Sequence, residues 1–194
     1  MSGRAAEPLR LFFALWPDPA AVARLALRRA ALRRQIAGRW LRAEDCHVTL
    51  VFLGPVAAAG LPGLRKLAGA ITVPAFALVL DRLECWGRGR ALCLTPTHVP
   101  AELALLVGRL EAGLSEAGRA PEGRSYRPHL TLARADLPAT VDEPPVEPIA
   151  LAIRGFRLVQ SAPQPDGARY RCLDSWRLAG GAGAGIPGGQ DPVT

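Results

Sequence analysis

Apolar positions along the chain change their spacing from segment to segment, and the spacing predicts the type of element. Short apolar runs bounded by turn residues predict strands, whereas apolar residues three and four apart predict amphipathic helices. Runs of the strand type occupy residues 9–15, 46–53, 76–85, 91–95, 129–133, 149–160 and 169–178. Helical spacing covers residues from about 19 to 36, 57 to 70 and 101 to 117. Because several strands follow one another directly, as antiparallel partners do, the sequence predicts an α+β fold.

Turn residues set several of the predicted boundaries. Asp18 is a suitable N-cap and Pro19 a suitable first helical residue, so the first helix is predicted to begin there. Gly54-Pro55 is predicted to close the second strand. A Pro-rich connection spans residues 138–148. Residues 179–194 are rich in Gly, Ala and Pro and are predicted to form a disordered tail, because they offer too little apolar surface to order themselves.

Length and composition limit the class of protein. The 194 residues fit one domain, which we place at residues 1–178, ahead of the predicted tail. Hydrophobic residues make up 49% of the chain and charged residues 21%, a balance that supplies a core and excludes wholesale disorder. No run approaches the roughly 20 apolar residues that a membrane-spanning helix needs. The apolar run at residues 11–16 is also too short for the core of a signal peptide, so we expect a cytoplasmic protein without membrane association.

The charge is strongly positive. The chain carries 24 basic and 17 acidic residues, a net charge of +7, and Lys66 is its only lysine. Arginine side chains present a fork of donors that matches phosphate oxygens, so this composition favours phosphate or nucleic-acid ligands. A general bias toward Ala, Gly, Pro and Arg also explains the ratio of Arg to Lys, but it does not explain the net charge.

The four cysteines, Cys46, Cys85, Cys93 and Cys172, are widely spaced. No C-x-x-C pair is present, which argues against a zinc knuckle and against a disulfide framework. We expect buried thiols in a reducing compartment. Cys46 immediately precedes His47, but neighbours in a strand point to opposite faces, so a cysteine–histidine catalytic pair is disfavoured.

Two of the three histidines lie in nearly identical strings, one in each half of the chain. His47-Val-Thr49-Leu and His129-Leu-Thr131-Leu both read H-x-T-L. Residues i and i+2 of a strand share a face, so each histidine projects together with its threonine while the apolar residues enter the core. Two such strands side by side would gather two imidazoles and two hydroxyls around one cleft. The third histidine, His98, lies in a turn-like stretch and is expected to be a solvated loop residue.

This set of side chains suits phosphodiester hydrolysis without a metal. One imidazole can accept a proton from water while the other donates a proton to the leaving alkoxide. The two hydroxyls can hydrogen-bond the oxygens of a phosphate held between them. A single H-x-T-L string is a weak signal, because a half-buried strand with a satisfied histidine is common, but two copies are hard to obtain by chance. A zinc site is a minor alternative, since neither string carries a carboxylate at ligand spacing.

The paired H-x-T-L strings resemble the signature of the two-histidine phosphoesterase superfamily. Within it, the chain is most similar to the RNA 2',3'-cyclic phosphodiesterases, which are also described as 2'-5' RNA ligases. Residues 47–54 and 127–134 match the two motifs, including Arg134 five residues after His129. The opening strand and the last two strands match as well, so the resemblance covers about residues 9–178.

The resemblance implies a bilobal fold of two pseudo-symmetric lobes of antiparallel sheet, with helices outside and a central groove that carries both H-x-T-L strands. It also implies hydrolysis of a 2',3'-cyclic phosphate to a 2'-phosphate without a metal or another cofactor. By motif match, His47 is expected to be the general acid for the leaving 3'-oxygen and His129 the general base for water, an order that pseudo-symmetry could reverse. Thr49, Thr131 and Arg134 are expected to hold the phosphate.

Several alternatives stay open from the sequence. The expected partners are RNA ends or nucleotides that bear a 2',3'-cyclic phosphate, and we expect a monomer. The same site could ligate RNA through a 2'-5' bond, act on a small nucleotide, or belong to an RNA-binding module that has lost catalysis. Trp86, Tyr126 and Trp40 are candidates for stacking on a base, although each is more typical of a core or a groove wall.

Overall fold

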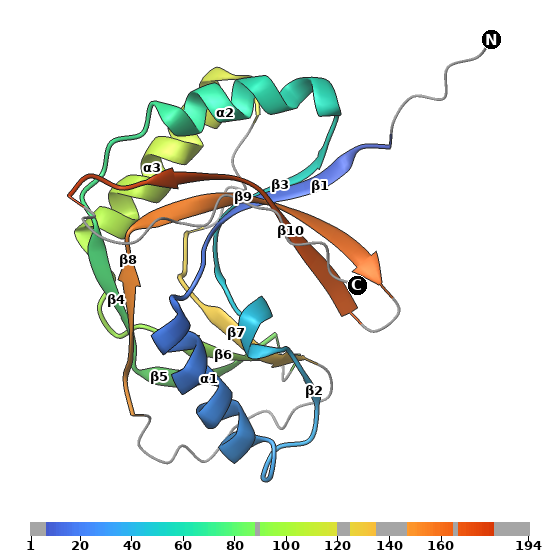
Figure 1. The fold of residues 1–194 in the computed structure, drawn as a ribbon, viewed down its shortest axis with the longest axis vertical. Helices are drawn as coiled ribbons and strands as arrows, with labels where there is room; N and C mark the ends of the chain where they lie inside the picture. Colours follow the sequence, from blue (N-terminus) through green and yellow to red (C-terminus); the bar gives the residue numbers. More distant parts are fainter. Residues whose placement is uncertain (1–6, 88–89, 120–124, 135–146, 165–166, 181–194) are drawn as a thin grey trace.

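The computed structural model describes residues 7–87, 90–119, 125–134, 147–164 and 167–180 (Figure 1). Strands predominate, and three α-helices and two short 3-10 helices accompany them in the described part of the chain. The strands are β1 (Leu9–Leu15), β2 (Arg39–Trp40), β3 (Val48–Val56), β4 (Phe76–Leu80), β5 (Arg82–Trp86), β6 (Ala91–Thr95), β7 (Leu130–Arg134), β8 (Ile149–Ile153), β9 (Gly155–Gln164) and β10 (Gly167–Arg177). The helices are α1 (Pro19–Leu32), α2 (Leu61–Gly69) and α3 (Ala101–Glu116), with 3-10 turns η1 (Ala43–Asp45) and η2 (Ala58–Gly60).

One antiparallel sheet forms the centre of the molecule. Its strands follow the order β10-β9-β1-β3-β7-β6-β5, and β2 pairs with β7 at the side of this path. The link between β3 and β7 is a single residue pair, Val48 with Leu130. A separate two-stranded sheet consists of β4 and β8. The predicted α+β class with antiparallel sheets is confirmed.

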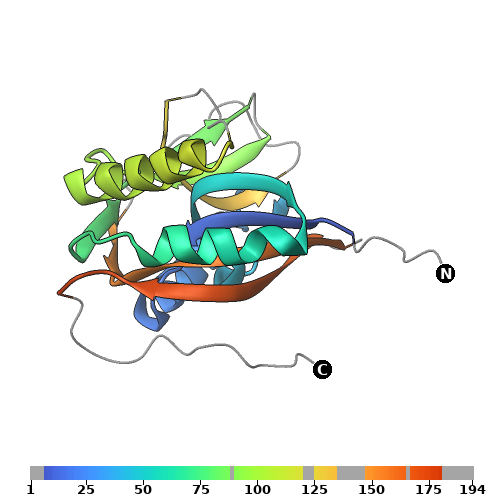
Figure 2. The ribbon, with the colours of Figure 1, turned by 90° about the horizontal axis from the view of Figure 1, so that it is seen from above.

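The helices cover the apolar face of this sheet from two directions. Helices α2 and α3 pack against each other and against β10 and β3, and they lie together at the top of Figure 1. Helix α1 packs against η1 and β8 at the opposite end, and Figure 2 shows it on the far side of the strands from α3. The core between these layers is continuous, and Phe13 and Phe156 are its largest fully buried side chains.

The predicted start of the first helix is confirmed. The Asp18 side chain accepts a hydrogen bond from the Ala21 amide at 2.9 Å, and Pro19 is the first helical residue. This bond satisfies one of the amides that a helix N-terminus leaves without an internal partner. The helix ends at Leu32, four residues before the predicted end near Ile36.

Three strand predictions were wrong at their boundaries. Gly54-Pro55 does not close its strand, because β3 continues to Val56. Gly54 instead adopts a φ of 65° next to an irregularity in the pairing of β3 with β1, a position where glycine avoids a steric penalty. The predicted strands 76–85 and 149–160 are each divided into two, β4 and β5 in the first case and β8 and β9 in the second.

Both divisions follow from a change in which alternate positions are buried. Leu78 and Leu80 are buried in β4, whereas the buried residue in β5 is Leu83, so the pattern changes from even to odd positions across Asp81. The Asp81 carboxylate accepts a hydrogen bond from the Thr97 amide at 2.7 Å at this corner. Within one continuous strand, every second side chain points to the same face. The change from even to odd buried positions therefore means that the chain leaves one sheet and enters another.

Some predictions cannot be compared with the structure in full. Most of the Pro-rich connection, residues 138–146, and the predicted tail from residue 181 onward lie outside the described residues, so the division into one domain and a tail stays a prediction. The short strand β2 was not predicted from the sequence pattern. No α-helix in the described part of the chain is long and apolar enough to cross a membrane.

Candidate active site

The two H-x-T-L strings meet in the middle of the sheet. Val48 and Leu130, the residues that directly follow the two histidines, form the antiparallel pair that joins β3 to β7, and both are fully buried. Facing residues of antiparallel strands share a face and alternate along each strand. His47 and Thr49 therefore lie on the same side of the sheet as His129 and Thr131, opposite the main core.

The same backbone contact orients each imidazole. His47 Nδ1 lies 2.8 Å from the Asp45 carbonyl oxygen, and His129 Nδ1 lies 2.9 Å from the Arg127 carbonyl oxygen. A carbonyl oxygen only accepts, so Nδ1 carries the hydrogen in both rings. Each histidine therefore keeps Nε2 for proton transfer, and both rings are fixed in the same tautomer.

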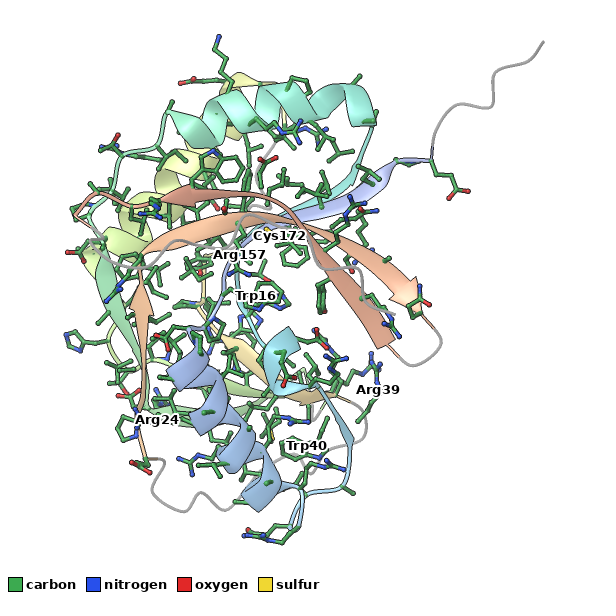
Figure 3. All side chains as sticks on the ribbon, viewed as in Figure 1. Trp16, Arg24, Arg39, Trp40, Arg157 and Cys172 are labelled. Carbon is green, nitrogen blue, oxygen red and sulfur yellow. The ribbon has the colours of Figure 1, made fainter. Side chains whose placement is uncertain are left out.

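An aromatic pocket surrounds His47. Its ring stacks on Trp16 with 4.9 Å between centroids and on Phe12 with 5.0 Å, and Tyr170 meets it edge-on at 4.9 Å. Phe12 belongs to a small apolar cluster on the face of β1 that points away from the main core. The Arg157 guanidinium lies 5.6 Å from the centre of the Trp16 ring, and the two labelled side chains lie together below β9 in Figure 3.

His129 has an aromatic neighbour of its own. The centroid of Trp86 lies 4.3 Å from that of His129. The Arg127 guanidinium lies 4.5 Å from the same indole ring. The Trp86 indole N–H donates to Glu84 at 2.7 Å, and Arg127 forms an ion pair with the same carboxylate at 3.3 Å. Each histidine therefore has a tryptophan beside it and an arginine guanidinium near that tryptophan, but only the His47–Trp16 pair is stacked, because the His129 and Trp86 rings are tilted by 44°.

Burial and neighbouring positive charge lower the pKa of both histidines. Burial lowers the pKa of His47 to about 4, against the opposing effect of its hydrogen bond to the Asp45 carbonyl, and the charges of Arg134 and His129 lower it further. The pKa of His129 is also lowered, mainly by burial, with additional effects of Arg134 and Arg127. Both imidazoles are therefore neutral near pH 7, and an anion between them would favour their protonated forms.

The predicted phosphate-holding residues lie around the same point. Thr131 is 8% exposed, and its hydroxyl lies 3.8 Å from the thiol of Cys93 on the adjacent strand β6. Burial raises the pKa of Cys93 to about 11, so its thiol stays protonated. Thr49 is half-buried, and its carbonyl oxygen accepts a hydrogen bond from Tyr126 at 3.1 Å. Arg134 is exposed, and its charge acts on both histidines.

The structure thus brings the two histidines and two threonines that the sequence singled out to one face of the sheet, with Arg134 near enough for its charge to act on both histidines. It also adds neighbours that the sequence did not indicate. These neighbours come from segments that carry no H-x-T-L string. Strand alternation could have indicated the face of Phe12 in β1, Glu84 in β5, Arg157 in β9 and Tyr170 in β10, whereas Trp16 lies just after the end of β1. Of the stacking candidates, Trp86 contacts His129. The ring nitrogen of Trp40 donates to the Ile36 carbonyl at 3.3 Å.

The other residues that the sequence raised lie apart from this chemistry. His98 is exposed in a bend, as predicted. Cys46 is buried, its thiol donates to the Arg42 carbonyl at 3.3 Å, and it makes no pair with His47. The four cysteines are free, but the prediction that all are buried was wrong, because Cys172 is exposed. In the described part of the chain, no three His, Cys, Asp or Glu side chains gather as metal ligands would.

Fold and site together define the class: an α+β protein in which two histidines of matching strings lie on one face of an antiparallel sheet, under the influence of the Arg134 charge. The sequence model of the 2'-5' RNA ligase superfamily matches residues 16–160. The chain is 35% identical to the RNA 2',3'-cyclic phosphodiesterase of Escherichia coli K12, covering 89% of this chain and 98% of that protein. It is 31% identical over 104 residues to the Bacillus subtilis protein of the same name, covering 50% and 55% of the two chains.

Solved structures agree with this assignment. The crystal structure of Escherichia coli LigT in its apo form matches with a TM-score of 0.81 at 34% identity, covering 89% of this chain and 99% of that one. LigT has also been crystallised with 3'-AMP and with phosphate. The chain belongs to the 2'-5' RNA ligase superfamily.

Proposed function

We propose that this protein is an RNA 2',3'-cyclic phosphodiesterase that opens a 2',3'-cyclic phosphate to a 2'-phosphate. The observation that carries the proposal is the antiparallel pairing of the two H-x-T-L strings at Val48 and Leu130, with both Nδ1 atoms bound to carbonyl oxygens. The name of the Escherichia coli relative, which covers nearly the whole of both chains, supports the same activity.

In the proposed reaction, Nε2 of one histidine accepts a proton from water as the water oxygen bonds to phosphorus. The bond from phosphorus to the 3'-oxygen breaks, and Nε2–H of the other histidine protonates that oxygen. The motif match assigns the base to His129 and the acid to His47. The acid must gain its proton against a lowered pKa, and the phosphate supplies the negative charge that favours this.

Thr49, Thr131 and Arg134 hold the phosphate in this proposal. A protonated Cys93 thiol can donate to the Thr131 oxygen, which leaves the Thr131 hydroxyl hydrogen for a phosphate oxygen. Arg134 supplies a full positive charge where negative charge develops on the equatorial oxygens. These residues supply the charge stabilisation that the reaction needs, so the proposal includes no metal or other cofactor.

An RNA end fits the surroundings of this site better than a small uncharged ester. The chain has a net charge of +7, and Arg134, Arg127 and Arg157 all lie near the two histidines or the tryptophans beside them. Positive charge attracts the phosphates of a strand, and aromatic walls suit unstacked bases. We therefore propose RNA ends with a terminal 2',3'-cyclic phosphate as the substrate class.

The direct test is turnover of a short RNA that ends in a 2',3'-cyclic phosphate, in the presence of EDTA. We expect a 2'-phosphate as the product, and no product from the double variant His47→Ala/His129→Ala. A 3'-phosphate product, or activity that is lost in EDTA and restored by zinc, would contradict the proposal.

The superfamily name also points to a second reaction at the same site. A 5'-hydroxyl in place of water would form a 2'-5' bond by the same acid–base pair. Supplying a 5'-hydroxyl RNA together with the cyclic-phosphate RNA, and measuring joined against hydrolysed product, separates ligation from hydrolysis. An RNA-binding module without catalysis would bind both RNAs and release neither product.

A further inference from the structure

The two halves of the site anchor their tryptophans in different ways. The ring nitrogen of Trp16, beside His47, donates to the main-chain carbonyl of Glu44 at 2.8 Å. The ring nitrogen of Trp86, beside His129, donates to the side-chain carboxylate of Glu84 at 2.7 Å. The first anchor is backbone and cannot be removed by substitution, whereas the second depends on one side chain.

The Glu84 carboxylate both accepts hydrogen bonds and forms ion pairs. Besides Trp86, it accepts a hydrogen bond from the Thr95 hydroxyl at 3.1 Å and forms ion pairs with Arg127 and Arg82, both at 3.3 Å. Its side chain is only 21% exposed. Burial opposes its ionisation, but the hydrogen bonds from Trp86 and Thr95 and the two arginines together lower the pKa of Glu84, so it is a carboxylate at neutral pH.

Two routes connect this carboxylate to His129. In the first, Glu84 fixes the indole of Trp86, and that indole lies against the imidazole with 4.3 Å between centroids. In the second, Glu84 binds the side chain of Arg127, and the Arg127 carbonyl oxygen accepts the Nδ1 hydrogen of His129 at 2.9 Å. Both routes run through other side chains, so the role that we assign to Glu84 is to position other groups.

We infer that Glu84 is a positioning residue for His129, which it holds in place through Trp86 and Arg127. This inference rests on the proposed function, because it assigns a support to one of the two proposed proton-transfer groups. A half-buried carboxylate near a proposed phosphate site would oppose anion binding, so we explain its presence by the groups that it orients. A catalytic group misplaced by about 1 Å can lose on the order of 100-fold in rate.

The experiment compares kcat and KM of the full-length protein with those of Glu84→Gln, Glu84→Ala, Trp86→Phe and the double variant Glu84→Ala/Trp86→Phe. We expect kcat to fall roughly 10-fold in Glu84→Ala, less than the roughly 100-fold that a full 1 Å misplacement can cost, because the Arg127 carbonyl still binds His129. KM should stay the same or decrease, because a negative charge near the phosphate is removed. Glu84→Gln, which can still accept from Trp86, should retain more activity than Glu84→Ala. The double variant should lose about as much as Glu84→Ala alone, since both changes break the same contact.

A second measurement links Glu84 to His129 and not to His47. On a substrate with an activated leaving group, the kcat loss of Glu84→Ala should behave as that of His129→Ala does, whether it persists or shrinks. Glu116→Gln, the same chemical change on the exposed end of α3, is the matched control and should leave kcat and KM unchanged.

The possible failures are distinguishable. If His129→Ala retains full activity, the proposed function is wrong. If His129→Ala is inactive but Glu84→Gln and Glu84→Ala keep their kcat, or raise KM without lowering kcat, the positioning role is wrong. Should Glu84→Ala fail to fold, Glu84→Gln and Trp86→Phe still decide the question through their kcat values.

Discussion

Val48 and Leu130 pair across the centre of the sheet, and this single contact joins β3 to β7. Because each residue directly follows a histidine, the pair relates the two H-x-T-L strings by a local two-fold axis. One more step along each strand places His47 beside Thr131 and Thr49 beside His129. The two copies of the motif therefore lie together at one point of the sheet.

Removing either imidazole should reduce turnover of the cyclic phosphate by at least about 100-fold, the usual contribution of a positioned general acid or base. The roles can be separated with a substrate whose leaving group needs no proton. On that substrate the loss caused by His47→Ala should shrink, while the loss caused by His129→Ala should persist. The opposite pattern in steady-state kinetics would show that the two roles are exchanged.

The residues proposed to hold the phosphate should have smaller effects. Thr49→Ala and Thr131→Ala each remove one of several donors, so each should cost less than either histidine substitution. Thr131→Ser, which keeps the hydroxyl, is the matched control and should retain most activity. Arg134→Ala should raise KM and weaken inhibition by inorganic phosphate, and an unchanged inhibition constant would exclude Arg134 from the phosphate site.

The rate should depend on pH as a bell whose optimum in kcat/KM lies below pH 6.5. This profile reports the free enzyme, in which the pKa of His47 is lowered to about 4 and that of His129 is lowered as well. This optimum does not depend on which histidine is the acid, because it lies between the pKa values of the two histidines in either case. The kcat profile should be displaced to higher pH, since the bound phosphate raises the pKa of both imidazoles. If the kcat and kcat/KM profiles coincided, the bound substrate would not be raising the pKa of the two imidazoles.

Stability should fall as the pH is lowered from about 6.5 toward 4. An unfolded histidine has a pKa near 6.5, and the pKa of folded His47 is about 4, so protons bind more tightly to the unfolded chain over this range. The contribution of His47 is present above pH 6.5 and is lost as the pH approaches 4. Urea unfolding at several pH values should show a loss on the order of 1–3 kcal/mol. His47→Ala should show a weaker dependence, and added phosphate should reduce the loss in the unsubstituted protein.

Glycine substitutions offer a test of the fold that does not involve the site. Gly54 has a φ of 65°, so Gly54→Ala should destabilise the protein by about 1–2 kcal/mol although the space for a methyl group exists. Gly63 lies in α2, where no neighbouring side chain comes within 4 Å of the place that a Cβ atom would take. Gly63→Ala should therefore stabilise the protein by up to about 1 kcal/mol. Thermal unfolding of the two variants should move in opposite directions.

Most strand and helix segments follow closely from local patterns, and the two predicted strands that the structure divides were misjudged for the same reason. Leu9–Leu15 and Ala91–Thr95 have the predicted bounds, because each is an apolar run between turn residues. The predicted strand 149–160 was divided at Arg154, since Ile149, Leu151 and Ile153 are buried before it and Phe156 and Leu158 after it. The change from odd to even apolar positions is visible in the sequence. Which sheet each half joins, however, depends on partner strands that are distant in the chain.

The sequence by itself determined which two histidines and two threonines share one face of their strands, because a period of two along a strand is a local property and the motif occurs twice. Only the tertiary structure decided the environment of that pair. Phe12, Trp16 and Tyr170 enclose His47, and Glu84 anchors the tryptophan beside His129. Burial and the charge of Arg134 then lower the pKa of both histidines below that of a free imidazole. These effects arise from residues that lie far apart in the chain. Strand pairing across the sheet brings them together, and no local pattern of the sequence encodes that pairing.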